Sequence, residues 1–254
     1  MPHATIQGHS LYYEWRGSAP VGAPVAVFLH DGLGAIGAWK DVPEHIADAL
    51  GIRALVFDRW GYGRSDPRAD FPFRFMEAEV DPFKELIDQL GTGPVHLVGH
   101  SDGGSIALLF AAKYPASVHA IVTEAAHVIV ERETQAGIEA LVELQRQGRT
   151  PGWLKRLHGE RAESLLAAWS TGWLSDQHAR WDITPCLPHV LHPLLAIQGE
   201  QDEFGTPRQV ELITGGVKGA ESWMVPRSGH TPHTFAQPDF ERRVVEFLAR
   251  HGTR

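Results

Sequence analysis

A serine in a glycine-rich turn is the first feature of this sequence that could do chemistry. Ser101 is the central residue of a Gly-x-Ser-x-Gly motif at 99–103, which follows an apolar run at 95–98 and precedes another at 106–112. A strand, a sharp turn and a helix in this order form a nucleophile elbow, which lifts the serine hydroxyl above the end of a sheet. Glycines suit both ends of the motif because side chains there would collide within the strained turn. The other interpretation is an ordinary helix cap, where serine is also common.

A serine hydroxyl becomes an effective nucleophile only when a base removes its proton and a carboxylate orients that base. Downstream, Asp202 follows the apolar run 193–197, and His230 follows the run 221–225. The order serine, acid, histidine is the order found in enzymes built on this elbow. We therefore predict Ser101 as nucleophile, Asp202 as orienting acid and His230 as base. The competing candidates are Glu124, Glu200 and Glu203 for the acid and His233 for the base.

The tetrahedral intermediate of acyl transfer needs fixed N–H donors, each contributing roughly 3 kcal/mol. The residue after the nucleophile supplies one donor, here the backbone N–H of Asp102. The second is expected from the loop 30–34, which reads His-Asp-Gly-Leu-Gly and follows the apolar run 24–29. We predict the Gly32 N–H as this donor and the Leu33 N–H as the second choice. His30 is expected to brace the loop.

Buried strands must position these residues, and continuous apolar runs of the required kind recur along the chain. They alternate with helical patterns and short loops, which indicates a parallel sheet with right-handed crossovers. The sequence thus predicts an α/β fold with a mostly parallel, eight-stranded sheet flanked by helices. The predicted strands lie at 4–16 (a hairpin), 24–29, 52–57, 95–98, 118–123, 193–197 and 221–225, and the predicted helices at 36–50, about 81–90, 105–114, 137–147, 162–174 and 235–249.

The segment 127–189 interrupts this alternation, because it contains helical patterns but no convincing strand. We predict that it forms a helical cap over the carboxyl edge of the sheet, where open α/β sheets bind ligands. The core is then 1–126 together with 190–254. Tryptophans are frequent in the cap, and they either line a substrate pocket or attach the cap to the core. These tryptophans are Trp153, Trp169, Trp173 and Trp181.

The composition of the chain argues against several classes of function. The chain has 254 residues, is 43% hydrophobic and carries a formal charge of −8, which argues against nucleic acid or an anionic membrane as partner. We expect neither a signal peptide nor a transmembrane span, and the single cysteine, Cys186, fits a reducing cytoplasm. Metal-ligand spacings such as His-Glu-x-x-His do not occur. We therefore expect a cytoplasmic enzyme with a small-molecule substrate and without metal or cofactor; the oligomeric state stays open.

These motifs together resemble the α/β-hydrolase family, and the resemblance covers nearly the whole chain except the cap. It implies the α/β-hydrolase fold and a serine hydrolase. By size and cap position the chain resembles valacyclovir-hydrolase-like enzymes and meta-cleavage-product C–C hydrolases. Serine at 101 separates it from haloalkane dehalogenases and epoxide hydrolases, which have aspartate there. The motifs are His30-Asp31-Gly32, the loop 58–65 (Asp-Arg-Trp-Gly-Tyr-Gly-Arg-Ser), the elbow 99–104, Asp202 and Ser228-Gly229-His230.

The resemblance also suggests a substrate-binding role for Asp102. In valacyclovir-hydrolase-like enzymes an aspartate directly after the nucleophile recognises a substrate amino group, and Asp102 matches that position. The other explanation is an acid in the first turn of a helix, which the helix dipole stabilises by up to ~1 kcal/mol. Asp31, where many relatives have glycine, can alter the shape or charge of its loop. The predicted substrate-binding residues are Asp31, Leu33, Asp102, Trp153, Trp169 and Trp173.

Other functions remain open at this point. Gly32, Gly34 and Gly37 form a Gly-x-Gly-x-x-Gly pattern, and Asp58 ends the next strand, as in dinucleotide-binding oxidoreductases. A hydrolase fold that only binds a ligand is another alternative. The same fold and residues also serve C–C bond, lactone or amide hydrolysis, perhydrolysis and cofactor-free oxygenation. We predict hydrolysis of a small-molecule ester, which can carry a cationic amine.

Overall fold

The computed structural model describes residues 2–252, and its centre is a single eight-stranded sheet. The strand order is β1-β2-β4-β3-β5-β6-β7-β8. The first hairpin pairs antiparallel, β2 pairs antiparallel with β4, and all other neighbours are parallel. The predicted fold class is therefore confirmed. The strands are β1 His3–Ile6, β2 His9–Arg16, β3 Val25–Leu29, β4 Arg53–Phe57, β5 Val95–His100, β6 Val118–Glu124, β7 Leu194–Gly199 and β8 Glu221–Val225.

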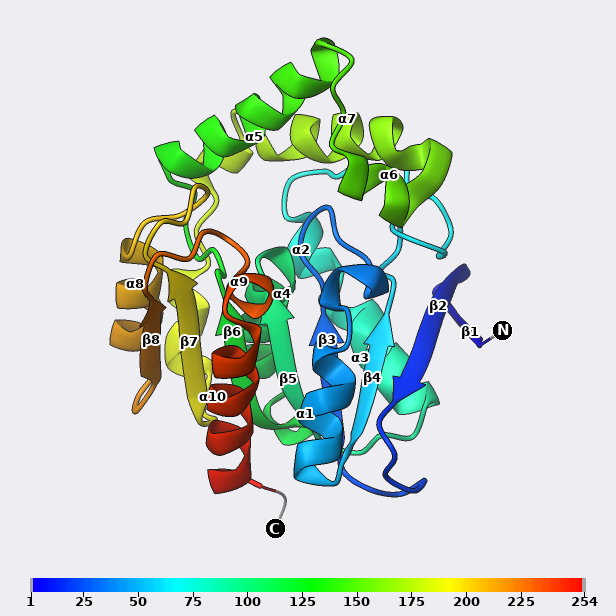
Figure 1. Ribbon diagram of the computed structural model, residues 1–254, viewed down its shortest axis with the longest axis vertical. Helices are drawn as coiled ribbons and strands as arrows, with labels where there is room; N and C mark the ends of the chain where they lie inside the picture. The colour runs from blue at the N-terminus through cyan, green and yellow to red at the C-terminus, as the bar shows by residue number, and fades with distance from the viewer. Residues whose placement is uncertain (1, 253–254) are drawn as a thin grey trace.

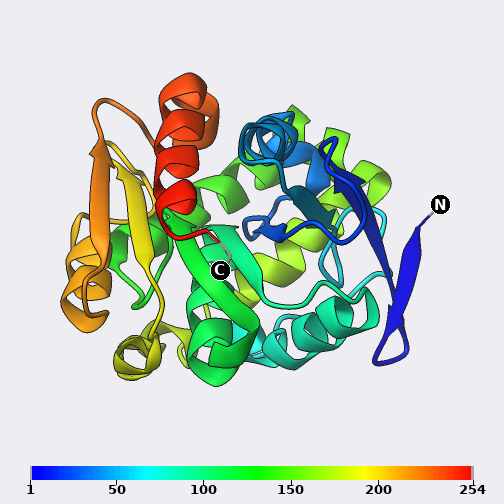
Figure 2. The same cartoon turned by 90° about the horizontal axis from the view of Figure 1, so that it is seen from below.

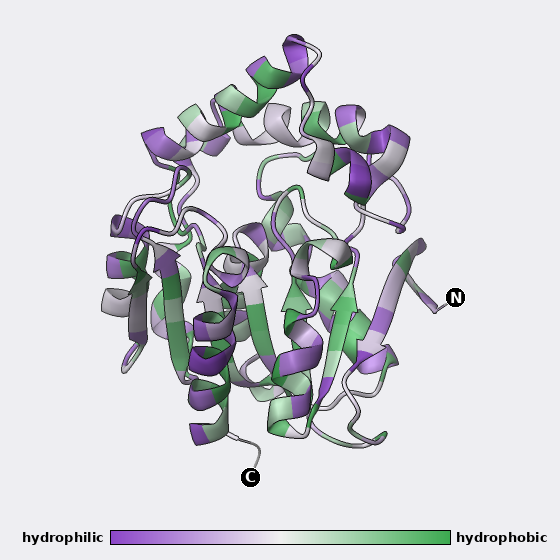
Figure 3. Cartoon of the chain, in the orientation of Figure 1, coloured by the Kyte–Doolittle hydropathy of each residue, from purple (hydrophilic) through white to green (hydrophobic). Residues whose placement is uncertain are grey.

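Helices cover both faces of the sheet, as Figures 1 and 2 show. Helices α1 (Val42–Leu50) and α10 (Gln237–Arg250) pack on one face. Helices α3 (Val80–Gln89), α4 (Asp102–Lys113) and α8 (Arg208–Gly216) pack on the other. The central strands are buried along their whole length and mainly apolar, whereas α1 and α10 show hydrophilic residues on their outer sides (Figure 3). Burial on both faces explains the continuous apolar runs in the sequence.

Several predicted elements need correction. The helix predicted at 36–50 is divided into a short 3-10 helix, Ile36–Trp39, and α1, because Lys40 adopts φ 51°, ψ −127°, which no helix accommodates. Four helices were missed, namely α2 (Phe75–Ala78), α6 (Gly152–His158), α8 and α9 (Pro232–Phe235). All four are short, and α8 ends in two glycines, which weaken the helical pattern in the sequence.

Three helices lie between β6 and β7, above the carboxyl ends of the strands in Figure 1. They are α5 (Arg132–Arg146), α6 and α7 (Ala162–Trp173). Short elements complete the described chain: α2 (Phe75–Ala78), α9 (Pro232–Phe235) and four 3-10 turns, Pro115–Ser117, Gly159–Arg161, His178–Arg180 and Thr184–His189. The division into core and cap at 127 and 189 stays a prediction. Every helix within residues 2–252 is too short or too polar to cross a lipid bilayer.

Candidate active site

Ser101 occupies the sharp turn between β5 and α4. Its φ of 53° and ψ of −119° lie in a region that residues other than glycine rarely adopt. A Cβ atom at Gly103 would overlap the carbonyl of Leu29, and one at Gly99 would overlap that of Gly103. This confirms the steric reason for glycine at both ends of the motif. Ser101 does precede the first residue of the helix, but its hydroxyl makes no capping hydrogen bond.

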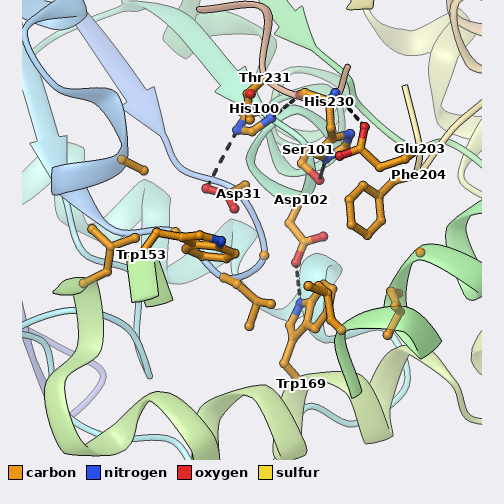
Figure 4. Close-up of a pocket in the computed structure, with 18 of the residues that line it drawn as sticks. Asp31, His100, Ser101, Asp102, Trp153, Trp169, Glu203, Phe204, His230 and Thr231 are labelled. Carbon is orange, nitrogen blue, oxygen red and sulfur yellow. Dashed lines mark hydrogen bonds and ion pairs between the residues drawn. The ribbon is translucent and has the colours of Figure 1, made fainter. Parts of the chain in front are cut away.

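The Ser101 hydroxyl faces the imidazole of His230 instead (Figure 4), and that imidazole in turn faces the carboxylate of Asp202. His230 Nε2 lies 3.0 Å from Ser101 Oγ, and His230 Nδ1 lies 2.8 Å from Asp202 Oδ1. Burial tends to raise the pKa of Asp202, but His230 outweighs it and holds this pKa below its usual value. An ionised carboxylate only accepts hydrogen bonds, so Nδ1 carries the proton and Nε2 is free to accept the serine proton. The structure thus brings the three predicted residues together in the required order.

The competing acids and the competing base have other partners. Glu203 accepts the backbone N–H of His230 at 3.1 Å, and Glu200 accepts that of Arg227 at 3.4 Å. Glu124 accepts the backbone N–H of His233 at 2.6 Å and its imidazole Nδ1–H at 2.8 Å. These contacts hold the segment 230–233 in place, and none of them reaches the imidazole of His230.

A second histidine is buried beside this segment. His100 donates from Nε2 to the carbonyl of His230 at 2.9 Å, and its Nδ1 lies 3.8 Å from Asp31 Oδ1. Burial opposes its charge, but Glu124 and Asp31 prevail and raise the pKa of His100 to about 9. His100, Glu124 and His233 have ligand atoms within 4.8 Å of one another, a spacing that a metal ion could exploit. His233 already donates to Glu124, and His100 donates to the carbonyl of His230, so we interpret the group as an ionic network beside the predicted base.

The predicted oxyanion loop lies against helix α7. A Cβ at Gly32 would come within 2.6 Å of the Trp169 indole and 2.7 Å of Asp102 Oδ2, so only glycine fits there. Within residues 2–252, the backbone N–H groups of Gly32, Leu33 and Asp102 donate to no protein acceptor. They are therefore available to a bound ligand. The structure does not itself decide between Gly32 and Leu33 as the second donor.

A cavity of about 730 Å³ opens above Ser101 and His230. Its walls are mainly apolar, and helices α5 to α7 contribute its roof. All six predicted substrate-binding residues line it. Trp181, by contrast, is buried away from the cavity, and its indole N–H points at Glu77. The six predicted residues that line the cavity are Asp31, Leu33, Asp102, Trp153, Trp169 and Trp173.

Three further residues line the cavity beside His230; sequence reasoning missed His127 and Phe204 and considered Glu203 only as a competing acid. His127 is buried with its ring 5.9 Å from that of His230, and burial together with this neighbour lowers the pKa of His127 to about 3. Phe204 lies 4.7 Å from the same ring. His127 follows β6 and the other two follow β7, so position at the carboxyl edge of the sheet is the signal that could have found them.

Asp102 is fully buried, with one carboxylate oxygen partnered and the other not. Oδ2 accepts the Trp169 indole N–H at 3.1 Å and lies 4.0 Å from an Arg59 Nη2. Oδ1 has no donor within the described residues. Burial raises the pKa of Asp102 to about 6, against the opposing effect of Arg59.

The glycine pattern at 32–37 does not form a phosphate-binding turn. The space beside Gly32 holds the Trp169 indole, that beside Gly34 holds the side chain of Asp31, and that beside Gly37 holds Leu157. Asp58, the proposed ribose ligand, is buried and accepts the backbone N–H groups at 36 and 64, at 2.7 and 2.8 Å. The dinucleotide-binding interpretation is therefore rejected on these contacts.

The fold and the arrangement of the site are those of an α/β-hydrolase, and the comparisons with known proteins agree with this class. The model of the alpha/beta hydrolase fold family matches residues 25–183. The chain belongs to this family and is a hydrolase of the α/β fold, as its motifs predicted.

Two relatives and one solved structure show which proteins this chain is similar to within the family. The chain is 30% identical over 251 residues to Serine hydrolase BPHL of Homo sapiens, covering 96% of this chain and 84% of that protein. It is 29% identical over 258 residues to a 2-hydroxy-6-oxononadienedioate/2-hydroxy-6-oxononatrienedioate hydrolase of Paraburkholderia xenovorans, covering 90% and 88%. Among solved structures, the enol-lactonase from Burkholderia xenovorans LB400 superposes with a TM-score of 0.77 over 97% of this chain and 99% of that one, at 19% identity. That last likeness bears on the fold alone.

Proposed function

We propose that this protein is a serine hydrolase that cleaves a small-molecule ester through an acyl-enzyme intermediate. The observation that carries the proposal is the pair of hydrogen bonds, 2.8 and 3.0 Å long, that joins Asp202 through His230 to Ser101. The strained backbone of Ser101 supports it, because such strain is retained where function requires it.

In the proposed reaction, Ser101 Oγ attacks the ester carbonyl while His230 Nε2 takes the hydroxyl proton. The N–H groups of Gly32 and Asp102 bind the oxyanion of the tetrahedral intermediate. His230 then returns the proton to the departing alcohol, which leaves the acyl group on Ser101. Water, deprotonated by the same imidazole, attacks the acyl-enzyme and releases the acid. Asp202 keeps the proton on Nδ1 throughout, so that Nε2 remains the base.

We also propose that 127–189 acts as a lid that shapes the acyl and leaving-group sites. Ile138, Trp153, Trp169 and Trp173 from this segment line the cavity. The mainly apolar lining favours an ester with apolar groups on both sides of the scissile bond. C–C bond, lactone and amide substrates, and cofactor-free oxygenation, are the alternatives on the same residues. One human relative is named a serine hydrolase, and a bacterial one a hydrolase of 2-hydroxy-6-oxononadienedioate.

A cationic amine on the ester is a second candidate feature. The unpartnered Oδ1 of Asp102 favours it, since a buried acceptor without a donor loses about 1–3 kcal/mol that a substrate N–H could recover. The helix dipole remains the competing explanation for an acid at this position. An α-amino ester and its desamino analogue should therefore be compared, and equal specificity constants would remove the amine from the proposal.

A panel of p-nitrophenyl esters, aminoacyl esters, lactones, anilides and a 2-hydroxy-6-oxo-dienoate tests the bond type directly. We expect measurable kcat/KM for the p-nitrophenyl esters, abolished in Ser101→Ala. Turnover of the dienoate or the lactones alone would replace ester hydrolysis by one of the alternatives.

A further inference from the structure

Arg59, a buried arginine outside the proposed triad, is directed at the loop that carries a proposed oxyanion donor. It follows β4, and its side chain is 2% exposed. Its Nη2–H donates to the carbonyl of Asp31 at 2.9 Å, and its Nη1–H donates to Glu79 at 2.8 Å. The carboxylate of Glu79 therefore fixes the guanidinium on one side, and on the other side the guanidinium donates to one backbone carbonyl, that of Asp31.

His30 supplies a further donor to the same carbonyl. The backbone N–H of Arg59 donates to His30 Nε2 at 3.0 Å, so the imidazole proton must be on Nδ1. Nδ1 lies 2.8 Å from the Asp31 carbonyl and donates to it. Burial, followed by the charge of Arg59, holds the pKa of His30 well below its usual value, which keeps the ring neutral in this tautomer. Two side-chain donors thus hold one oxygen.

The Asp31 carbonyl and the Gly32 N–H belong to the same peptide unit. That peptide is trans, so its N–H points opposite to its carbonyl. The carbonyl faces Arg59, which does not line the cavity above Ser101, whereas Gly32 does line it. The Gly32 N–H is consequently directed away from Arg59, towards the cavity. A hydrogen bond to a carbonyl oxygen also polarises the peptide, so that the N–H of the same peptide becomes a stronger donor. The effect is larger when the bond comes from a charged group such as a guanidinium in the protein interior.

We propose that Arg59 is a positioning residue for the oxyanion hole, which orients and polarises the Asp31–Gly32 peptide so that Gly32 N–H binds the developing oxyanion. This inference rests on the proposed serine hydrolase function. Arg59 touches neither substrate nor triad, and it acts through the peptide that it holds. Its charge also lies near the second donor, because Nη2 is 4.0 Å from Asp102 Oδ2.

Arg68 provides a matched control for the loss of a buried arginine. Its side chain is 4% exposed and bonds the same Glu79 at 3.3 Å, while its Nε–H goes to the carbonyl of Asp70 at 2.8 Å. Arg68→Met therefore removes an equally buried guanidinium from the same carboxylate and leaves the Asp31–Gly32 peptide untouched.

The experiment measures p-nitrophenyl acetate turnover and the second-order rate of fluorophosphonate labelling in Arg59→Lys, Arg59→Met and Arg68→Met. Loss of one oxyanion donor lowers kcat by about 10²–10³-fold. We expect both Arg59 variants to lose about 10–100-fold in kcat and in labelling rate, with KM within about threefold. Lysine retains the charge but cannot bond Glu79 and the carbonyl together as the fork does. Arg68→Met should stay within about threefold of the wild-type rates.

A spectroscopic measurement separates positioning from general disturbance of the fold. A trifluoromethyl ketone that adds to Ser101 forms a hemiketal oxyanion, and NMR reports its pKa. We expect this pKa to rise in the Arg59 variants and to stay constant in Arg68→Met, because only the former weaken a donor to the oxyanion. If Arg59→Met does not fold, Arg59→Lys, which keeps a positive charge beside Glu79, carries the comparison with Arg68→Met.

Folded Arg59 variants that match the wild type in labelling rate and hemiketal pKa would overturn the inference, as would equal losses in Arg68→Met. The proposed function is judged separately by the wild-type protein. Absence of labelling in the wild type, or equal labelling of Ser101→Ala, would reject the serine hydrolase itself.

Discussion

Replacing Glu124 by glutamine should change how the stability of this protein depends on pH. Glu124 is fully buried and bonds His233, and its charge, together with Asp31, raises the pKa of His100 against the effect of burial. Glutamine keeps the shape of the side chain and removes its charge. The protonated form of His100 then loses the larger of its two favourable charge interactions, the other being with Asp31.

The pKa of His100 sets the magnitude and sign of the effect. This pKa is about 9 in the folded chain against 6.5 for an ordinary histidine. Because the folded value is the higher one, the stabilisation is fully present below pH 6.5 and is lost as the pH rises through 9. A difference of this size corresponds to about 3 kcal/mol. We therefore expect the contribution of His100 to the free energy of unfolding to fall by about 3 kcal/mol between pH 6.5 and pH 9 in the wild type, so that the stability of the wild type falls relative to that of Glu124→Gln as the pH rises.

Urea unfolding at a series of pH values, followed by tryptophan fluorescence and circular dichroism, measures this difference. Glu131→Gln is the matched control, because Glu131 is a half-buried carboxylate whose partners, Thr206 and Gln209, do not titrate. This control should lower stability equally at all pH values in the range. Equal pH dependence of stability in the wild type and in Glu124→Gln would refute the charged state assigned to His100.

Two further substitutions test the site. Trp169→Phe removes an N–H bond to the buried carboxylate of Asp102, whereas the Trp173 indole N–H has no partner within the described residues. Trp169→Phe should therefore reduce the free energy of unfolding by about 2 kcal/mol more than Trp173→Phe in urea titrations, and equal losses would show that the bond contributes nothing. Asp202→Asn should lower kcat by about 10⁴-fold without loss of fold, because the imidazole of His230 then takes the wrong tautomer. A loss below tenfold would reassign the acid.

The parallel sheet could be predicted because strands buried on both faces consist mainly of apolar residues. The run 24–29 is an example, and it became β3 at Val25–Leu29. The elbow was predictable for a related reason, because side chains at positions 99 and 103 would collide with the backbone within and beside the turn, so that both positions require glycine. Asp202 and His230 could be selected from many acids and histidines because both follow strands that end at the same edge as Ser101.

What the sequence could not reveal are the contacts between distant segments. The pairing of Glu124 with His233, and of Arg59 with the Asp31 carbonyl, depends on how strands β4 and β6 lie beside loops from elsewhere in the chain. The helix break at Lys40 was hidden for another reason, because it results from a backbone conformation that the residue type disfavours. The orientation of Trp181 towards Glu77 depends on packing of the segment 127–189 against α2, and periodicity alone cannot distinguish a pocket residue from a core residue.

The most direct test of the account is the identity of the residue that a fluorophosphonate modifies. Intact-mass and peptide mass spectrometry should find one adduct per chain, on Ser101, and none in Ser101→Ala. An adduct on another residue, or labelling that persists in Ser101→Ala, would contradict the central claim that this hydroxyl is the nucleophile.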